Sequence, residues 1–168
     1  MDKKILMAYA TKYGSTAEIA QKIGEILIYS GLDANVLPVN RVRDLDPYEA
    51  VVLGSAVYIG KWRKEAARFL ESNEKKLVNK DVWLFSSGPA GEGDPVELMN
   101  GWRFPAALHP IADRIQPHDI AVFHGSVNMD KLNSIEKLML NKVKSPIGDF
   151  RDWNTIIAWA TSIGEALR

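Results

Sequence analysis

A hydroxyl-rich segment, Thr11-Lys12-Tyr13-Gly14-Ser15-Thr16, joins an apolar run to a helical pattern. Backbone amides at a helix start, aided by the helix dipole, can bind a phosphate group. The hydroxyls of Thr11, Ser15 and Thr16 would add donors, and Gly14 would let the backbone approach the phosphate closely. A plain turn followed by a capped helix is the alternative interpretation. Neither the Walker loop nor the glycine-rich dinucleotide fingerprint occurs here.

A second segment, Ser55-Ala56-Val57-Tyr58-Ile59-Gly60-Lys61-Trp62, places aromatic side chains around a glycine. Tyr58 and Trp62 offer flat faces on which an aromatic ring could stack. We assign Ala56, Val57 and Ile59 to the same site, and Gly60 would let the peptide turn beside the ring. The alternative places both aromatic residues in the core or at a subunit contact.

A third segment, Ser87-Gly88-Pro89-Ala90-Gly91, consists of small residues after another apolar run. Its amides would face the polar edge of a flavin ring and stabilise the anionic reduced form. Taken alone, such a segment favours a plain surface turn. Together, the three segments predict a site for a flavin with a single phosphate, which is FMN.

The elements that must position these segments follow from the apolar periodicity. Short apolar runs predict strands, and amphipathic stretches predict helices between them. Alternation of buried strands and helices indicates a parallel sheet covered on both faces, in which ligands bind at the carboxyl ends of the strands. A capping box, Ser15 to Glu18, marks the first helix start, and Gly31 its end. The expected strands span 5–10, 35–39, 48–54, 82–86 and 120–123, and the expected helices 15–30, 63–77, 105–114, 131–144 and 152–167.

Composition narrows the function classes. The 168 residues fit one domain, 1–168, and the absence of cysteine excludes disulfides, thiolate catalysis and iron–sulfur clusters. The chain carries 21 basic and 21 acidic residues, which argues against a nucleic-acid binder. Without a visible signal peptide or membrane-spanning run, a cytoplasmic protein is expected.

The chain resembles the flavodoxin-like FMN-binding family along its whole length. Thr11, Gly14 and Thr16 match a T-x-x-G-x-T phosphate loop, and Tyr58, Gly60 and Trp62 match the second loop. Within the family it is most similar to the branch of menaquinone-dependent protoporphyrinogen oxidases, in the stretches 54–60, 85–89 and 148–153. The resemblance implies a three-layer α/β sandwich with a five-stranded parallel sheet in the order 2-1-3-4-5. It also implies FMN, two-electron oxidation of protoporphyrinogen IX and a quinone acceptor.

Other features have mainly structural interpretations. His109, His118 and His124 lack metal-ligand spacing, so no metal is expected, although His124 follows the fifth strand and could carry a proton near a substrate. Asp152 is expected to cap the last helix.

The helix 131–144 has an apolar stripe and several lysines. We expect it to cover the sheet, and the alternative is peripheral contact with the inner face of the membrane. The stripe consists of Leu132, Ile135, Leu138, Met139 and Val143.

Two functions are consistent with these residues. The first is an FMN-dependent oxidoreductase acting on a small molecule or a quinone. The alternative is a flavodoxin-type electron carrier that serves a redox partner protein and has no substrate of its own. Such carriers are typically acidic, which steers them to basic partners, whereas this chain has no net charge. Trp102 and Phe104 are also expected to cover the site. Both points favour the enzyme.

Overall fold

A parallel β-sheet forms the middle layer of the computed structural model, which describes residues 3–58, 60–89, 91, 93–143 and 147–168. The strand order is β2-β1-β3-β5-β6, with β4 paired to β3. This order confirms the predicted 2-1-3-4-5 arrangement. The prediction did not include the two-residue β4, so the predicted fourth and fifth strands are β5 and β6 in the structure. The strands are β1 (Lys4–Ala10), β2 (Asp33–Pro38), β3 (Ala50–Tyr58), β4 (Lys61–Trp62), β5 (Asp81–Ser87) and β6 (Asp119–Phe123).

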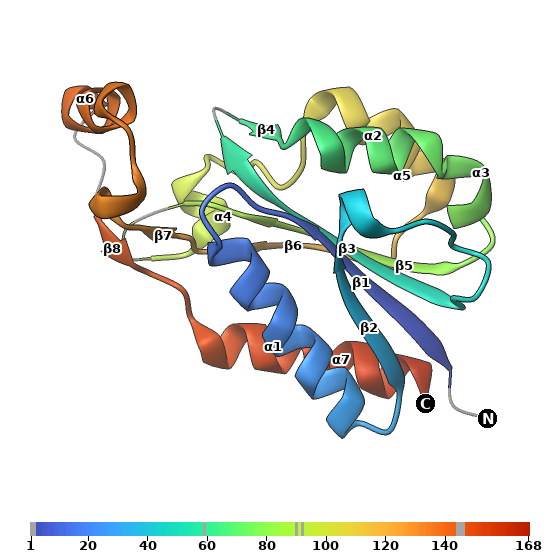
Figure 1. Ribbon diagram of the computed structural model, residues 1–168. Helices are drawn as coiled ribbons and strands as arrows, with labels where there is room; N and C mark the ends of the chain where they lie inside the picture. The colour runs from blue at the N-terminus through green and yellow to red at the C-terminus, as the bar shows by residue number, and fades with distance from the viewer. Residues whose placement is uncertain (1–2, 59, 90, 92, 144–146) are drawn as a thin grey trace.

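Helices cover both faces of the sheet (Figure 1). One face carries α1 (Ser15–Tyr29) and α7 (Trp153–Leu167). The opposite face carries α2 (Lys64–Ser72), α3 (Glu74–Leu77) and α5 (His109–Ile115). The short elements η1 (Val39–Arg41), α4 (Pro95–Leu98) and η2 (Ala106–Leu108) lie between them in the chain. The predicted three-layer α/β sandwich is therefore confirmed.

Alternating side chains of the central strands divide the core into two apolar clusters. Ile5 and Met7 point toward α1 and α7, whereas Leu6 and Ala8 point toward α2 and α5. On α1, the predicted apolar face is buried, with Ile19, Ile23 and Leu27 fully inaccessible to solvent. Gly54 on β3 lies directly against the ring of Phe85 on β5, where a Cβ would come within 2.0 Å of ring carbon Cζ.

Several element boundaries differ from the sequence-based expectation. The segment 55–62, expected to be a loop, is mostly strand, because β3 continues to Tyr58 and turns back as β4. Val57 pairs with Trp62 across this hairpin, and β-branched and aromatic residues favour such a pairing. The expected helix 63–77 is divided at Asn73 into α2 and α3. The expected helix 105–114 begins with the 3₁₀ turn η2.

The segment after β6 leaves the sheet. It forms β7 (Ser126–Val127), η3 (Met129–Lys131), α6 (Ser134–Val143) and β8 (Gly148–Asp149), and β7 and β8 pair in antiparallel fashion.

The expectation that the 131–144 helix covers the sheet is wrong. Figure 1 shows α6 beyond the carboxyl ends of the strands, away from the sheet, because the β7–β8 pair directs the chain outward. Ile135 and Leu138 of the predicted stripe are 70% and 68% exposed. Lys144 and the side chain of Val143 lie outside the described part of the chain.

Candidate functional site

A cavity of about 540 Å³ lies at the carboxyl ends of β1, β3 and β5, where the sheet topology places a ligand site. All three predicted segments contribute to its wall. The predicted residues that line the cavity are Thr11, Lys12, Tyr13, Ser15, Thr16, Ala56, Val57, Tyr58, Ser87 and Gly88.

The first segment forms a tight turn into α1. Gly14 has a φ of 92°, a left-handed conformation that glycine adopts without steric cost, and its N–H donates to Thr11 Oγ1 at 3.0 Å. The helix therefore begins at Ser15, and the predicted Ser15–Glu18 capping box is wrong. Because Ser15 already belongs to the first turn, its hydroxyl does not cap the helix. The Ser15 Oγ is buried at the cavity wall and has no hydrogen-bond partner among the described residues.

The second and third segments lie on neighbouring strands, since Ala56 of β3 pairs with Ser87 of β5. Tyr58 is 43% exposed at the cavity rim, and the Lys12 ammonium lies 4.6 Å from its ring centroid. The third segment is attached to the end of β6, because the Gly88 amide donates to the Phe123 carbonyl at 3.1 Å. Tyr58, Ala56 and Gly88 thus surround one part of the cavity.

Several predicted residues lie elsewhere. Trp62 is buried in the core, where its ring makes an edge-to-face contact with Phe104 and its Nε1 donates to Ser86 Oγ. Although the sequence analysis placed Trp62 beside the cofactor ring, the β3–β4 hairpin turns it inward and it does not line the cavity. Gly60, Pro89 and Gly91 also do not line the cavity. Ile59 and Ala90 lie outside the described residues.

The segment 92–116 does not provide the expected aromatic cover. Phe104 is 2% exposed and belongs to the core cluster beneath α2 and α5, and Trp102 is absent from the cavity wall. His109 packs edge-on against Phe104, and His118 stacks on Trp83. His124 is buried, with its ring nitrogens near the Pro89 and Gly93 carbonyl oxygens. Within the described ranges, no three His, Cys, Asp or Glu side chains are arranged to hold a metal ion.

A wall that the sequence analysis did not assign comes from the chain after β6. Gly125 to Asn128, Lys131, Leu132, Glu136 and Met139 all line the cavity. Glu136 on α6 is buried and accepts hydrogen bonds from Lys12 Nζ, at 2.8 Å, and from the Tyr13 hydroxyl. The Lys12 ammonium holds the pKa of the Glu136 carboxyl below its usual range. These contacts join α6 to the first segment.

Glu136 also belongs to a capping box at the start of α6. Its amide donates to Asn133 Oδ1 at 2.8 Å, and the Asn133 amide donates back to Glu136 Oε1 at 3.2 Å. The spacing Asn133-x-x-Glu136 is a helix-start signal that the sequence contains, although it does not reveal the contact with Lys12.

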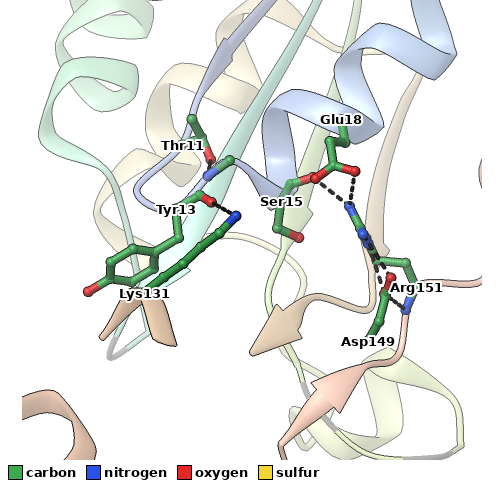
Figure 2. Close-up of polar contacts among 8 residues, drawn as sticks. Thr11, Tyr13, Ser15, Glu18, Lys131, Asp149 and Arg151 are labelled. Atoms are coloured by element: carbon green, nitrogen blue, oxygen red, sulfur yellow. Dashed lines mark hydrogen bonds and ion pairs between the residues drawn. The ribbon is translucent and has the colours of Figure 1, made fainter. Parts of the chain in front are cut away.

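Arg151 fixes the other side of the α1 N-terminus (Figure 2). Its side chain is 8% exposed, and its guanidinium bonds both carboxylate oxygens of Asp149, at 2.9 and 2.8 Å. The same group donates to the Ser15 carbonyl at 3.3 Å and lies 3.5 Å from the Glu18 carboxylate. Arg151 holds the pKa of the Asp149 carboxyl below its ordinary value. The last helix starts directly afterwards, with Asp152 as its cap as predicted.

Comparison with known proteins identifies the family. A flavodoxin domain model matches residues 6–154. No curated protein sequence matches the chain significantly. Among solved structures, a flavodoxin from the domain Archaea superposes with a TM-score of 0.63 at 16% identity, covering 98% of each chain.

Two other solved structures show the same fold. A flavodoxin mutant from Pseudomonas aeruginosa has a TM-score of 0.59 at 13% identity and covers 98% of each chain. A rubredoxin oxygen:oxidoreductase from Desulfovibrio gigas has a TM-score of 0.63 at 16% identity; 98% of this chain matches 36% of that longer one. The family match indicates FMN as the cofactor. The chain belongs to the flavodoxin domain family.

Proposed function

We propose that the cavity binds FMN with its phosphate at the start of α1. The first amides of a helix have no intrahelical acceptor, and α1 is a 15-residue helix with the positive end of its dipole at this turn. The buried Ser15 hydroxyl needs a partner, which a phosphate oxygen would supply. Thr11 and Thr16, which also line the cavity, add hydroxyl donors.

The ring of FMN would then extend toward Tyr58, with the Ala56, Val57, Ser87 and Gly88 backbone at its edges. When bound, FMN supplies one- and two-electron redox chemistry. Val57 and Tyr58 offer apolar and aromatic contact to the ring. The Lys12 ammonium lies 4.6 Å from the centroid of the Tyr58 ring and pairs with Glu136. The pairing holds the Lys12 ammonium at the cavity wall.

Replacing Tyr58 by Ala should make bound flavin more fluorescent and lower FMN affinity about fivefold, because a stacked aromatic pair contributes about 1 kcal/mol and quenches flavin emission. Fluorescence titration of the apoprotein measures both effects. Tyr29→Ala is the matched control, since Tyr29 is 91% exposed at the far end of α1. Equal behaviour of the two variants would show that Tyr58 does not contact the ring.

The protein is, in this proposal, an FMN-dependent oxidoreductase with a small, largely apolar reaction partner such as a quinone. The observation that carries this proposal is the wall formed by the α6 segment. Leu132 and Met139 line the cavity together with Tyr58 and Val57, so apolar side chains enclose space next to the proposed ring position. Apolar enclosure with a few polar groups suits a small flat molecule. Protoporphyrinogen IX, implied by the sequence resemblance, is the first electron donor to test.

We expect reduced FMN in this protein to transfer electrons to menaquinone analogues faster than to a cytochrome. Stopped-flow reoxidation of the anaerobically reduced protein measures both rates. Saturable dependence on quinone concentration would support a quinone site, because saturation requires binding. Negligible reaction with quinone beside fast transfer to a cytochrome would instead identify an electron carrier.

The carrier function is the second candidate, and the exposed face of α6 favours it. Ile135 and Leu138 are exposed on the helix whose Glu136 and Met139 line the cavity, and a redox partner protein could dock there. With Lys137 and Lys142 on the same helix, this face also suits peripheral contact with an anionic membrane surface. Within the described ranges, no helix combines the length and apolar character that a membrane crossing requires.

A further inference from the structure

We propose that Lys131 supplies the positive charge that binds the cofactor phosphate and makes the site select FMN over riboflavin. This inference rests on the proposed placement of FMN. Lys131 lies in the segment after β6, far along the chain from the first segment, and it is not part of the T-x-x-G-x-T pattern.

The position of its ammonium group is the first observation. Lys131 Nζ donates to the Tyr13 carbonyl at 3.1 Å, across the turn that leads into α1 (Figure 2). The same nitrogen lies 3.9 Å from the place where a Cβ on Gly14 would be. An ammonium group has three donors, so after the bond to Tyr13 it still has two for another acceptor. A phosphate at the start of α1 would be within its reach.

The pairing of the other cations is the second observation. Four basic residues line the cavity, namely Lys12, Arg63, Lys131 and Arg151. Lys12 pairs with Glu136, Arg63 with Glu65, and Arg151 with Asp149. In the part of the chain that the structure describes, Lys131 makes no ion pair with a carboxylate. Its charge is therefore available to an anion, whereas the other three are already compensated.

Arg151 and Lys131, which both donate to backbone carbonyls at the start of α1, thus have different roles. Arg151 is a positioning residue, because its guanidinium holds the Ser15 carbonyl and two carboxylates at the helix start. Lys131 is exposed and carries a compact charge on a flexible stem, which suits contact with a phosphate monoester. The phosphate of FMN carries up to two negative charges near neutral pH, and riboflavin has no phosphate. Charge at Lys131 should consequently matter for FMN alone.

The test compares FMN and riboflavin binding to the full-length apoprotein. Lys131→Gln should weaken FMN binding about tenfold and leave riboflavin affinity unchanged, and Lys131→Arg should restore most of the loss. FMN affinity of the unmodified protein should fall with rising salt, and this dependence should be weaker in Lys131→Gln. Lys137→Gln is the matched control, because Lys137 is exposed on α6 and does not line the cavity.

Thermal unfolding of the apoprotein variants checks that the folds are equally stable. An unchanged ratio of FMN to riboflavin affinity in Lys131→Gln would overturn the role of Lys131 while leaving FMN binding intact. Failure of the unmodified protein to bind FMN would overturn the proposed function, and the inference with it. The two failures are therefore distinguishable.

Discussion

Gly14→Val is expected to lower FMN affinity about 100-fold. The backbone of Gly14 has a φ of 92°, which a β-branched residue adopts only at a cost of about 1–3 kcal/mol, so the turn into α1 will shift. The shift moves the Ser15 and Thr16 amides away from the proposed phosphate position, and hydrogen bonds to a charged group contribute about 1.5–3 kcal/mol each. Isothermal titration of the apoprotein with FMN measures the loss.

Gly31→Val separates this local effect from general destabilisation. Gly31 ends α1 with a φ of 90° and has no neighbouring atom within 4 Å of a Cβ. It carries the same backbone strain as Gly14 at the opposite end of the same helix, remote from the cavity. The two variants should lose similar stability on thermal unfolding, and only Gly14→Val should lose FMN affinity. A similar loss of affinity in both would contradict the phosphate position.

Gly54→Ala should destabilise the protein by about 3 kcal/mol. The added Cβ would lie 2.0 to 2.5 Å from three carbons of the Phe85 ring, and Phe85 is fully buried in the core cluster that includes residues of α1 and α7. Overpacking of this kind usually costs about 1–3 kcal/mol. The upper end applies because the ring also contacts Phe123 and Trp159 and has little room to move. Urea unfolding followed by circular dichroism measures the change.

A double variant tests whether the clash is the cause. Phe85→Leu should destabilise the protein by itself, because it leaves a cavity, but it should partly rescue Gly54→Ala. The coupling free energy between the two sites is therefore expected to be favourable and above about 1 kcal/mol. Additive effects would mean that the damage of Gly54→Ala arises elsewhere in β3.

The layered fold could be predicted because local patterns determine it. Residues 5–10 and 82–86 are nearly continuous apolar runs, and the spacing of Ile19, Ile23 and Leu27 is helical. The three cavity segments could be predicted for the same reason, because each lies at or directly after the carboxyl end of a buried strand. Trp62 could not be placed, since the tight hairpin that turns it inward depends on pairing between Val57 and Trp62 rather than on local composition.

The contribution of α6 to the cavity wall could not be predicted from local sequence patterns. An apolar stripe such as Ile135 and Leu138 normally indicates a helix packed on a core, and only the β7–β8 pairing directs this helix outward. The contacts of Glu136 with Lys12 and of Lys131 with the Tyr13 carbonyl join residues more than 100 positions apart. Their side chains are ordinary surface types in sequence, so the role of each comes from the fold.

The β7–β8 pair also bears on how this domain could diversify. Val127 and Gly148 pair with each other, so the chain segment between them begins and ends at neighbouring positions, as an inserted loop does. The free energy of loop closure rises only slowly with loop length, so such a segment can be lengthened, shortened or exchanged at a low cost in stability. Phe123 and Trp153, on either side, would keep their places in the sandwich. Evolution, or a designer grafting a new segment here, could thus change what the pocket accepts while the sheet stays as it is.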